Sequence, residues 1–597
     1  MGEWNKKLAK LLALSGFVLG SLCFFSMATA NDDVSELGDL DLGELLTLEV
    51  SSATGMAQSL SKAPAIIEVI SRKQIQRRNY QSVAEALSSI PGLFVNYDYV
   101  FNDVGVRGVS GESRGASRLL KVLIDGHPIS FRSETSNWLG PELIPMAAIE
   151  RIEVIRGPGS ALYGANAFLG VISIVTRKAS DIGSTEVHAG GSSFGHWKNG
   201  YDFGITSGYE VGPFELLLSL QHQRKNRSGL SLPCTSFLNN VEDPESTFGQ
   251  SANGCDYQKD KFQKEGVFDR KSFNDIESPT SFVGKLGFEL SDVLPLVDGD
   301  SNLGKLSFFA NLQSIDSRGS FSDWGMLNQS TGTQPDGTEV KMPRTGNRIG
   351  LFNSILAGSY SLELFNERVG LDLGMRYASG GVTDTERLKD ISGQLDRSKY
   401  GYTGLDYYGN LRITALEDVG RVGSLTLIKN LTLVLGADQT VDTPVYIKKE
   451  GLSIMDNPTH EYASAELTNQ GALGQITGSL LNGRVSVVLG ARYDSNEGAV
   501  LEEDRISTLE DEEVERLCNG NQVCYESQNY RAGITFLLLK DFLELEGGPL
   551  VDELYSKILW GTAFKAPSPA FLYNSDILGE RPFFPNPVLL PQDVSSL

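Results

Sequence analysis

The chain has 597 residues, with 52 Lys and Arg against 75 Asp and Glu, so its formal net charge is −23. This acidic balance argues against a nucleic-acid partner, which would need a basic surface. Hydrophobic residues make up only 40% of the chain, too few for a bundle of membrane-spanning helices.

The first thirty residues have the pattern of a secretory signal. Lys6, Lys7 and Lys10 precede an apolar run over 11–25, and Ala-Thr-Ala at 28–30 supplies a small-residue cleavage site. An N-terminal membrane anchor is the weaker alternative, because the run is short and is followed by acidic residues. No other run of 18 apolar residues occurs, so the exported chain is expected to lack transmembrane helices.

Residues 31–52 predict an acidic arm, which is either a short amphipathic helix or flexible, followed by the β-prone strip "TLEVSS". Residues 53–180 predict a small mixed α/β domain. In chain order it has a strand leading into a helix over 65–75, an amphipathic helix within 82–95 that is stopped by Pro91-Gly92, and strands within 121–129, 149–156 and 170–178.

From about residue 181 to 597 the apolar residues recur at every second position. Clear examples span 282–290, 368–377, 405–413 and 485–494. Strands of soluble sandwiches usually have about 5–6 residues, whereas strands that cross a membrane have about 9–11. We count about thirteen such strands, and their polar faces carry charges of both signs and glycines.

Short links alternate with long polar inserts, roughly 226–278, 317–345, 380–402 and 497–527. Short turns on one side and long loops on the other are typical of outer-membrane β-barrels. Two sequence-local cysteine pairs fall in these inserts. We expect disulfides Cys234–Cys255 and Cys518–Cys524 in an oxidising compartment. A metal site is the alternative, but the pairs lack CxxC spacing and no His lies near them.

Several ordered motifs resemble the plug and barrel of the TonB-dependent outer-membrane receptors. They are "PAIIEVISRKQI", "SVAEALSSIPGLFV", "VGVRGVSG", "VLIDGHPI", "IERIEVIRGPGSALYGANAFLGVISIVTRK", "FKAPSPAFLY" and "NPVLLPQ". The resemblance implies a transmembrane antiparallel β-barrel of twenty-two strands, filled by an N-terminal mixed α/β plug, in the outer membrane of a Gram-negative cell. It also implies several partners: TonB with its inner-membrane motor, lipid and lipopolysaccharide, the barrel assembly machinery and a scarce nutrient.

The last two motifs normally stand well before the end of such receptors. Here the sequence stops five residues after Gln592. We therefore expect a C-terminally truncated chain that lacks about a third of its barrel and does not close as written.

The resemblance also suggests roles for particular residues. The expected coupling segment, or TonB box, comprises Leu46, Thr47, Leu48, Glu49, Val50, Ser51 and Ser52. An exposed extended strip of this kind can add a strand to a partner's sheet; an ordinary strand at the plug edge is the alternative. Arg107 and Arg156 resemble plug arginines that face barrel glutamates. One of those glutamate positions falls at Gln592, which brings no charge.

Ligand contact is expected from the upper loops of the plug, through Tyr97, Tyr99, Phe101, Phe131, Arg132 and Trp138. Aromatic rings with one Arg suit a flat, anionic ligand such as a ferric chelate. The alternative is that these rings pack the plug against the barrel wall. None of the five His lies between Phe564 and Leu590, where haem receptors of the family carry theirs, which disfavours haem.

The expected function is TonB-dependent import of a ferric siderophore, with cobalamin or another large nutrient as the first alternative. A passive adhesion or structural barrel is a second, which the plug and the coupling strip disfavour. A signalling receptor is rejected, because only residues 31–46 separate the cleavage site from Thr47. No Ser/His/Asp grouping is apparent, so we expect no enzyme, no cofactor and no metal site.

Overall fold

The computed structural model describes residues 49–50, 58–97, 100–109, 117–194, 198–226, 231–233, 269–271, 276–293, 303–319, 331–333, 339–341, 347–386, 388–389, 395–450, 466–500, 517–518, 522–545, 548–568 and 591–596. The chain divides into two compact units, and everything below belongs to the unit Glu49–Leu597. The expected signal segment and the Cys234–Cys255 pair lie outside the described residues. Among the described helices, none is long and apolar enough to cross a membrane.

The small domain is built on a five-stranded mixed sheet. Its strand order is β3 (Ile67–Ser71), β8 (Ile149–Arg156), β9 (Gly170–Thr176), β6 (Leu120–Ile124) and β7 (His127–Pro128). Strands β6 and β9 are parallel and the other pairs are antiparallel. The strands expected within 121–129, 149–156 and 170–178 are all present.

Two helices and a hairpin pack on this sheet. Helix α3 (Arg72–Arg78) begins at a capping box formed by Ser71 and Gln74. The helix expected to continue to the stop at Pro91-Gly92 is shorter than predicted, because α4 spans only Val83–Leu87. Pro91 and Gly92, whose φ is +82°, turn the chain into the hairpin of β4 (Leu93–Tyr97) and β5 (Asn102–Val106). Between Leu87 and Pro91 the chain tightens into turns, because the amides of Ser89 and Ile90 donate to the carbonyls of Ala86 and Leu87, three residues back.

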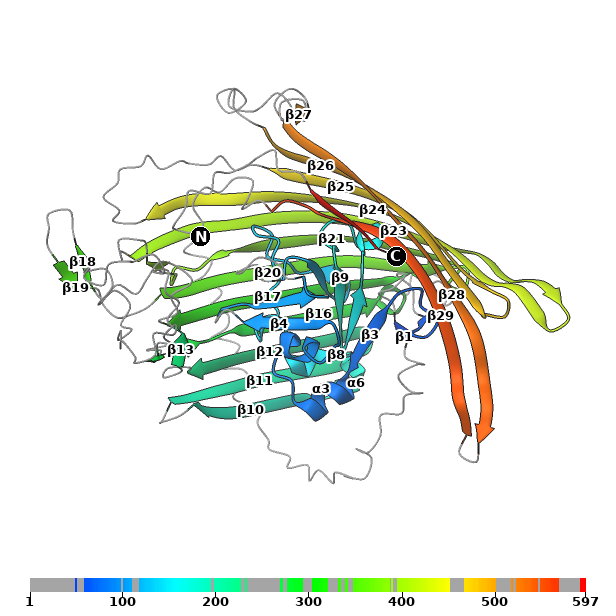
Figure 1. Cartoon of the computed structure of the whole chain (residues 1–597), viewed down its shortest axis with the longest axis horizontal. Helices are drawn as coiled ribbons and strands as arrows, with labels where there is room; N and C mark the ends of the chain where they lie inside the picture. Colours follow the sequence, from blue (N-terminus) through cyan, green and yellow to red (C-terminus); the bar gives the residue numbers. More distant parts are fainter. Residues whose placement is uncertain are drawn as a thin grey trace, which may run out of the picture. The chain divides into compact units, whose positions relative to one another are not determined.

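Most of the rest of the described chain forms one antiparallel sheet that follows the sequence order (Figure 1). Seventeen strands are assigned to it, and four of these have five residues or fewer: β15 (Ile276–Glu277), β22 (Leu388–Lys389), β27 (Leu517–Cys518) and β30 (Gln592–Ser596). The thirteen long strands match the number expected from the alternation. They are β10 (Thr185–Phe194), β11 (Lys198–Val211), β12 (Phe214–Asn226), β16 (Thr280–Glu289), β17 (Lys305–Gly319), β20 (Asn347–Leu364), β21 (Val369–Val382), β23 (Leu395–Val422), β24 (Leu425–Glu450), β25 (Leu467–Leu480), β26 (Val485–Val500), β28 (Gln522–Leu545) and β29 (Gly548–Lys565).

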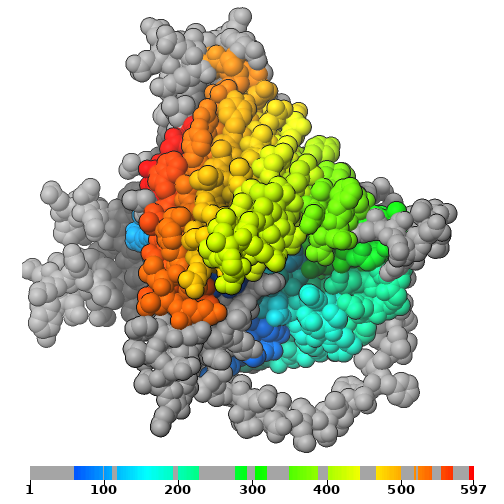
Figure 2. Space-filling view, turned by 90° about the vertical axis from the view of Figure 1, so that its right-hand side faces the viewer, coloured from blue at the N-terminus to red at the C-terminus, as the bar shows by residue number. Residues whose placement is uncertain are grey.

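Figure 2 shows how these strands lie beside one another in sequence order, from green through yellow to orange. The insert expected over 380–402 is shorter than predicted, since β21 continues to Val382 and β23 already begins at Leu395. Short elements complete the described structure: η2 (Met146–Ala148), α5 (Ser160–Tyr163), α6 (Ala179–Ile182), α7 (Leu290–Val293) and the pairs β1 (Glu49–Val50) with β2 (Gln58–Ser59), β13 (Ser231–Pro233) with β14 (Asp269–Lys271), and β18 (Thr331–Thr333) with β19 (Glu339–Lys341).

The two faces of the large sheet differ in the opposite sense to those of a soluble protein. On β12, Leu218 and Leu220 are about 40% exposed, at 41% and 39%, whereas Ser219 and Gln221 are buried. Apolar side chains on the solvent-accessible face and polar ones toward the small domain suit a strand with lipid on one side and a filled lumen on the other. The small domain packs on this polar face.

Candidate functional site at the plug–barrel interface

Asparagine side chains of the large sheet hold the main chain of the small domain. Asn311 of β17 donates from Nδ2 to the carbonyl of Leu143 at 3.0 Å. Asn353 of β20 donates in the same way to the carbonyl of Ile129 at 2.9 Å. Both amides are buried. A buried amide of this kind needs partners, so these contacts fix where residues 129–143 lie on the wall.

The electrostatic centre of the interface is Arg132. Its guanidinium binds both oxygens of Asp406 on β23, at 2.8 and 2.7 Å, and Oδ1 of Asp442 on β24 at 2.6 Å. Burial opposes the charged form, but these two carboxylates hold the pKa of Arg132 well above its ordinary value. The side chain is 13% exposed and that of Asp406 only 2%. A planar guanidinium that grips carboxylates in this way resists displacement.

Aromatic rings pack beside this ion-paired cluster. Phe131 meets the ring of Tyr402 edge-on at 5.5 Å and stacks on Trp138 at 5.0 Å. The Tyr402 hydroxyl in turn donates to Oδ1 of Asn353. Phe101 also stacks on Trp138, at 6.0 Å. The segment 129–132 is thereby held to β20, β23 and β24 by polar and apolar contacts together.

A second charged cluster lies on β24 and β26. Arg492 binds Asp438 at 2.7 Å and Asp494 at 2.7 Å. The small domain approaches it through Gly164, where an added Cβ would lie 2.9 Å from Nη2 of Arg492. Because Gly164 also has φ +70°, only glycine fits this turn without strain.

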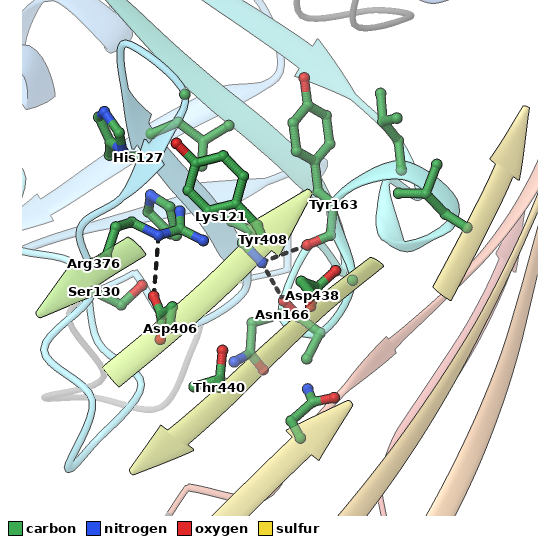
Figure 3. Close-up of a pocket in the computed structure, with 18 of the residues that line it drawn as sticks. Lys121, His127, Ser130, Tyr163, Asn166, Arg376, Asp406, Tyr408, Asp438 and Thr440 are labelled. Atoms are coloured by element: carbon green, nitrogen blue, oxygen red, sulfur yellow. Dashed lines mark hydrogen bonds and ion pairs between the residues drawn. The ribbon is translucent and has the colours of Figure 1, made fainter. Parts of the chain in front are cut away.

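Between the two clusters lies a cavity of about 790 Å³ (Figure 3). Lys121 points across it and donates from Nζ to the carbonyl of Tyr163 at 2.5 Å and to that of Ala165 at 3.2 Å. Burial, with the nearby charge of Arg492, lowers the pKa of Lys121 to about 8. The cavity is lined by apolar side chains and by both cations and carboxylates, so its walls are mixed in polarity and balanced in charge.

His127 also lines the cavity and stacks on Phe309 at 4.5 Å. Burial, followed by the charge of Arg376, lowers its pKa to about 4, so the ring is neutral at physiological pH. Its Nδ1 is buried without a hydrogen-bond partner. Within the described ranges there is no group of three or more His, Cys, Asp or Glu side chains that could hold a metal.

The residues predicted to bind ligand have mixed positions. Phe101, Phe131 and Trp138 are at most 2% exposed, which fits the packing alternative. Arg132 is occupied by barrel aspartates. Tyr97 is 39% exposed, and its hydroxyl donates to Glu277 at 3.0 Å. Tyr99 lies outside the described residues.

The residues predicted to lock plug to barrel are not brought together by the contacts found in the described part of the chain. Arg156 binds Glu68 and donates to the carbonyl of Pro91 at 2.8 Å, both within the small domain. Arg107 is exposed, with φ +51°. Gln592 is an exposed residue of β30, opposite Lys565. Sequence reasoning missed Asp406 and Asp442, whose only signal is their place on a polar strand face.

Two other predictions can be located. Of the expected coupling segment, Glu49 and Val50 form β1 and pair with Ser59 and Gln58 of β2. Its other members lie beyond the described ranges. Cys518 and Cys524 are joined by a disulfide, as the sequence predicts.

The large antiparallel sheet has long strands and a polar inner face, and the N-terminal domain docks on that face. These features define the class as a plugged β-barrel of the outer-membrane type. Residues 59–171 match the model of the TonB-dependent Receptor Plug Domain. This part of the chain is therefore similar to the plug of the TonB-dependent receptors.

Among relatives, the chain is 36% identical over 183 residues to the "Iron-regulated outer membrane virulence protein" of Vibrio cholerae serotype O1, covering 30% of this chain and 25% of that protein. It is 33% identical over 190 residues to the "Vitamin B12 transporter BtuB" of Photobacterium profundum, covering 31% and 28%. The matched segment thus spans about a quarter of the length of these relatives.

Solved structures share the fold at low identity. The hemophore receptor HasR of Serratia marcescens, in complex with its hemophore and heme, superposes with a TM-score of 0.54 at 13% identity, covering 90% of this chain and 69% of that one. The ferripyoverdine receptor of Pseudomonas aeruginosa superposes with a TM-score of 0.52 at 11% identity, covering 87% and 59%.

Proposed function

We propose that this protein imports a ferric siderophore across the outer membrane of a Gram-negative cell, driven by TonB and its inner-membrane motor. The observation that carries the proposal is the docking of a plug domain on the polar inner face of the sheet through Arg132, Asp406 and Asp442. A folded domain in the lumen disfavours a passive pore or adhesin, because it obstructs the path along the sheet. The similarity to an iron-regulated outer-membrane protein favours iron as the nutrient.

In this proposal the outer face of the sheet, with exposed side chains such as Leu356, Leu489 and Ile558, contacts lipid and lipopolysaccharide. Barrel assembly machinery inserts it. TonB adds a strand to the coupling segment at Glu49–Val50 and pulls, and the plug rearranges to let the ligand pass. The chain's own residues bind and gate; we assign them no catalytic step.

Cobalamin is the second candidate, because the similarity to the vitamin B12 transporter covers nearly the same share of the chain, 31% against 30%, at nearly the same identity. Both ligands are too large for open pores. Their recognition resides in variable surface loops, so the plug alone does not separate them.

The test is nutrient uptake by cells that lack their own siderophore and cobalamin receptors and express this chain. Radiolabelled ferric siderophores and radiolabelled cobalamin are supplied separately, with and without TonB. We expect saturable iron uptake that is lost when TonB is deleted. Uptake of cobalamin alone selects the second candidate. Uptake that persists without TonB indicates a passive barrel, and no uptake of either nutrient overturns both import readings.

A further inference from the structure

Lys557 of strand β29 contacts the main chain that enters the plug. Along this strand Ile558 and Trp560 lie on the outer face, 58% and 42% exposed, so Lys557 lies on the inner one. Its Nζ donates to three carbonyls of one short segment. The distances are 3.4 Å to Leu60, 2.7 Å to Ala63 and 3.2 Å to Ala65.

The neighbouring strand β28 contacts the same segment. Arg531 donates from Nη2 to the carbonyl of Pro64 at 3.4 Å. Two residues further along, an added Cβ at Gly533 would lie 3.3 Å from Cβ of Pro64, so the segment packs closely on the wall. Ala63 is fully buried and Ala65 is 7% exposed. Two barrel cations therefore hold residues 60–65, which we call the entry segment.

In these contacts the cationic side chains bind main-chain carbonyls, whereas Arg132 and Arg492 bind carboxylates. An ammonium group has three N–H donors, and here each has a main-chain carbonyl available. Hydrogen bonds from a charged donor are stronger than neutral ones. Because the acceptors are carbonyls, the contact depends on the path of the backbone and would be lost if that path changed.

The entry segment lies in the chain between the expected coupling segment and the plug sheet. It begins directly after β2, the partner strand of Glu49–Val50, and ends just before β3, an edge strand of the plug sheet. A force applied at β1 therefore reaches the entry segment before it reaches the plug sheet.

We propose that Lys557 is a positioning residue that, together with Arg531, clasps the entry segment to the barrel wall and must release it before the plug can rearrange. The anchoring itself follows from the contacts of Lys557; that a pulling partner releases it rests on the proposed function. The clasp is separate from the Arg132 cluster, which holds a later part of the plug's chain to β23 and β24.

Hydrogen exchange on the full chain in lipid or detergent tests the clasp. The amides of Lys62 and Ala63 donate to the carbonyl of Ser59 at 3.0 and 3.1 Å, and that of Ala65 donates to the carbonyl of Ala63 at 2.8 Å, so their exchange reports the opening of the segment. In Lys557→Met we expect their exchange to be at least about tenfold faster, because a charge-assisted contact is lost. Lys557→Arg, which keeps a cationic donor, restores much of the protection.

The matched control is Lys540→Met on β28, where the lysine is exposed. Equal exchange in Lys557→Met and Lys540→Met overturns the clasp. So does faster exchange throughout β8 and β9, which would indicate general destabilisation. Exchange requires neither ligand nor motor. A chain that shows the expected exchange but imports nothing refutes the import function and leaves the clasp standing. A chain that imports a nutrient but shows equal exchange in Lys557→Met and Lys540→Met refutes the clasp and leaves the import function standing.

Discussion

Arg132 and Asp406 are 274 positions apart in the chain, yet the guanidinium of one binds both carboxylate oxygens of the other at 2.8 and 2.7 Å. The pair joins a loop of the plug to strand β23, and Asp442 and Arg376 complete the cluster, with Nε of Arg376 3.1 Å from Asp406. Breaking a buried pair by removing one partner is costly, because the other charge stays buried. The cluster is therefore where the plug–barrel interface is most sensitive to substitution.

Asp406→Asn should lower the free energy of unfolding by about 3 kcal/mol, since Arg132 and Arg376 lose a shared carboxylate. Denaturant titration followed through the buried Trp138 measures the change. Glu417→Gln is the control, because its partner Arg368 and Glu417 are both more than half exposed. The control should change stability by less than about 1 kcal/mol. A loss of similar size in the two variants would contradict the assigned importance of the cluster.

Gly404→Ala should displace Arg132. An added Cβ would overlap both Nη1 of Arg132 and Oδ1 of Asp442, closer than any real contact. Overpacking of this kind costs about 1–3 kcal/mol, so a lower melting temperature is expected. Gly191→Ala on β10 is the matched control, because nothing lies within 4 Å of its added Cβ. An unchanged melting temperature in Gly404→Ala would mean that Arg132 moves aside freely.

Glu142 makes stability depend on pH. Burial raises its pKa to about 7, and the charge of Glu277 acts in the same direction. A raised carboxyl pKa means that the folded state prefers the protonated acid. The protonated Glu142 therefore adds to the free energy of unfolding. This stabilisation is fully present below the ordinary carboxyl pKa of 4.5 and is lost as the pH rises through 7.

Glu142→Gln should remove this dependence and be more stable than the parent above about pH 8, by about 3 kcal/mol. Below the ordinary carboxyl pKa the two should be nearly equal. Unfolding measured across this pH range tests it, with Glu210→Gln at an exposed position of β11 as control. Parallel stability curves for Glu142→Gln and the parent would count against a protonated Glu142.

Val50→Pro should abolish energised uptake while leaving ligand binding intact. Val50 pairs with Gln58 in the β1–β2 ladder, and proline removes the N–H that strand addition uses. Val50→Thr, which keeps the N–H and a β-branched side chain, should retain uptake. Uptake assays and ligand binding on intact cells measure both quantities. Normal uptake in Val50→Pro would show that this strip is not the coupling segment.

The sequence predicts the long strands well, because an apolar residue at every second position is typical of a strand whose two faces meet different surroundings. It also indicates that Asp406 lies on a polar strand face. It does not predict that Arg132 is its partner, because pairing across 274 residues depends on strand register and on where the plug sits. Aromatic residues in a loop, such as Phe131 and Trp138, look the same in sequence whether they face a ligand or a core.

The helix expected to continue to Pro91-Gly92 illustrates a second limit. Val83, Leu87 and Ile90 recur at helical spacing, yet α4 ends at Leu87. The residues that follow it still pack inward, because a turn can bury Ile90 as well as a helix can. Periodicity therefore predicted burial correctly and the backbone incorrectly.

The small β1–β2 ladder has a consequence for the thermodynamics of docking. Ordering the backbone of a residue costs about 1–2 kcal/mol. At Glu49 and Val50 that entropy is already lost on folding, through pairing with Ser59 and Gln58. A partner that adds a strand here meets an extended template rather than a random coil, so its affinity is linked to the stability of the ladder. Substitutions in Gln58–Ser59 would then weaken docking without touching the partner.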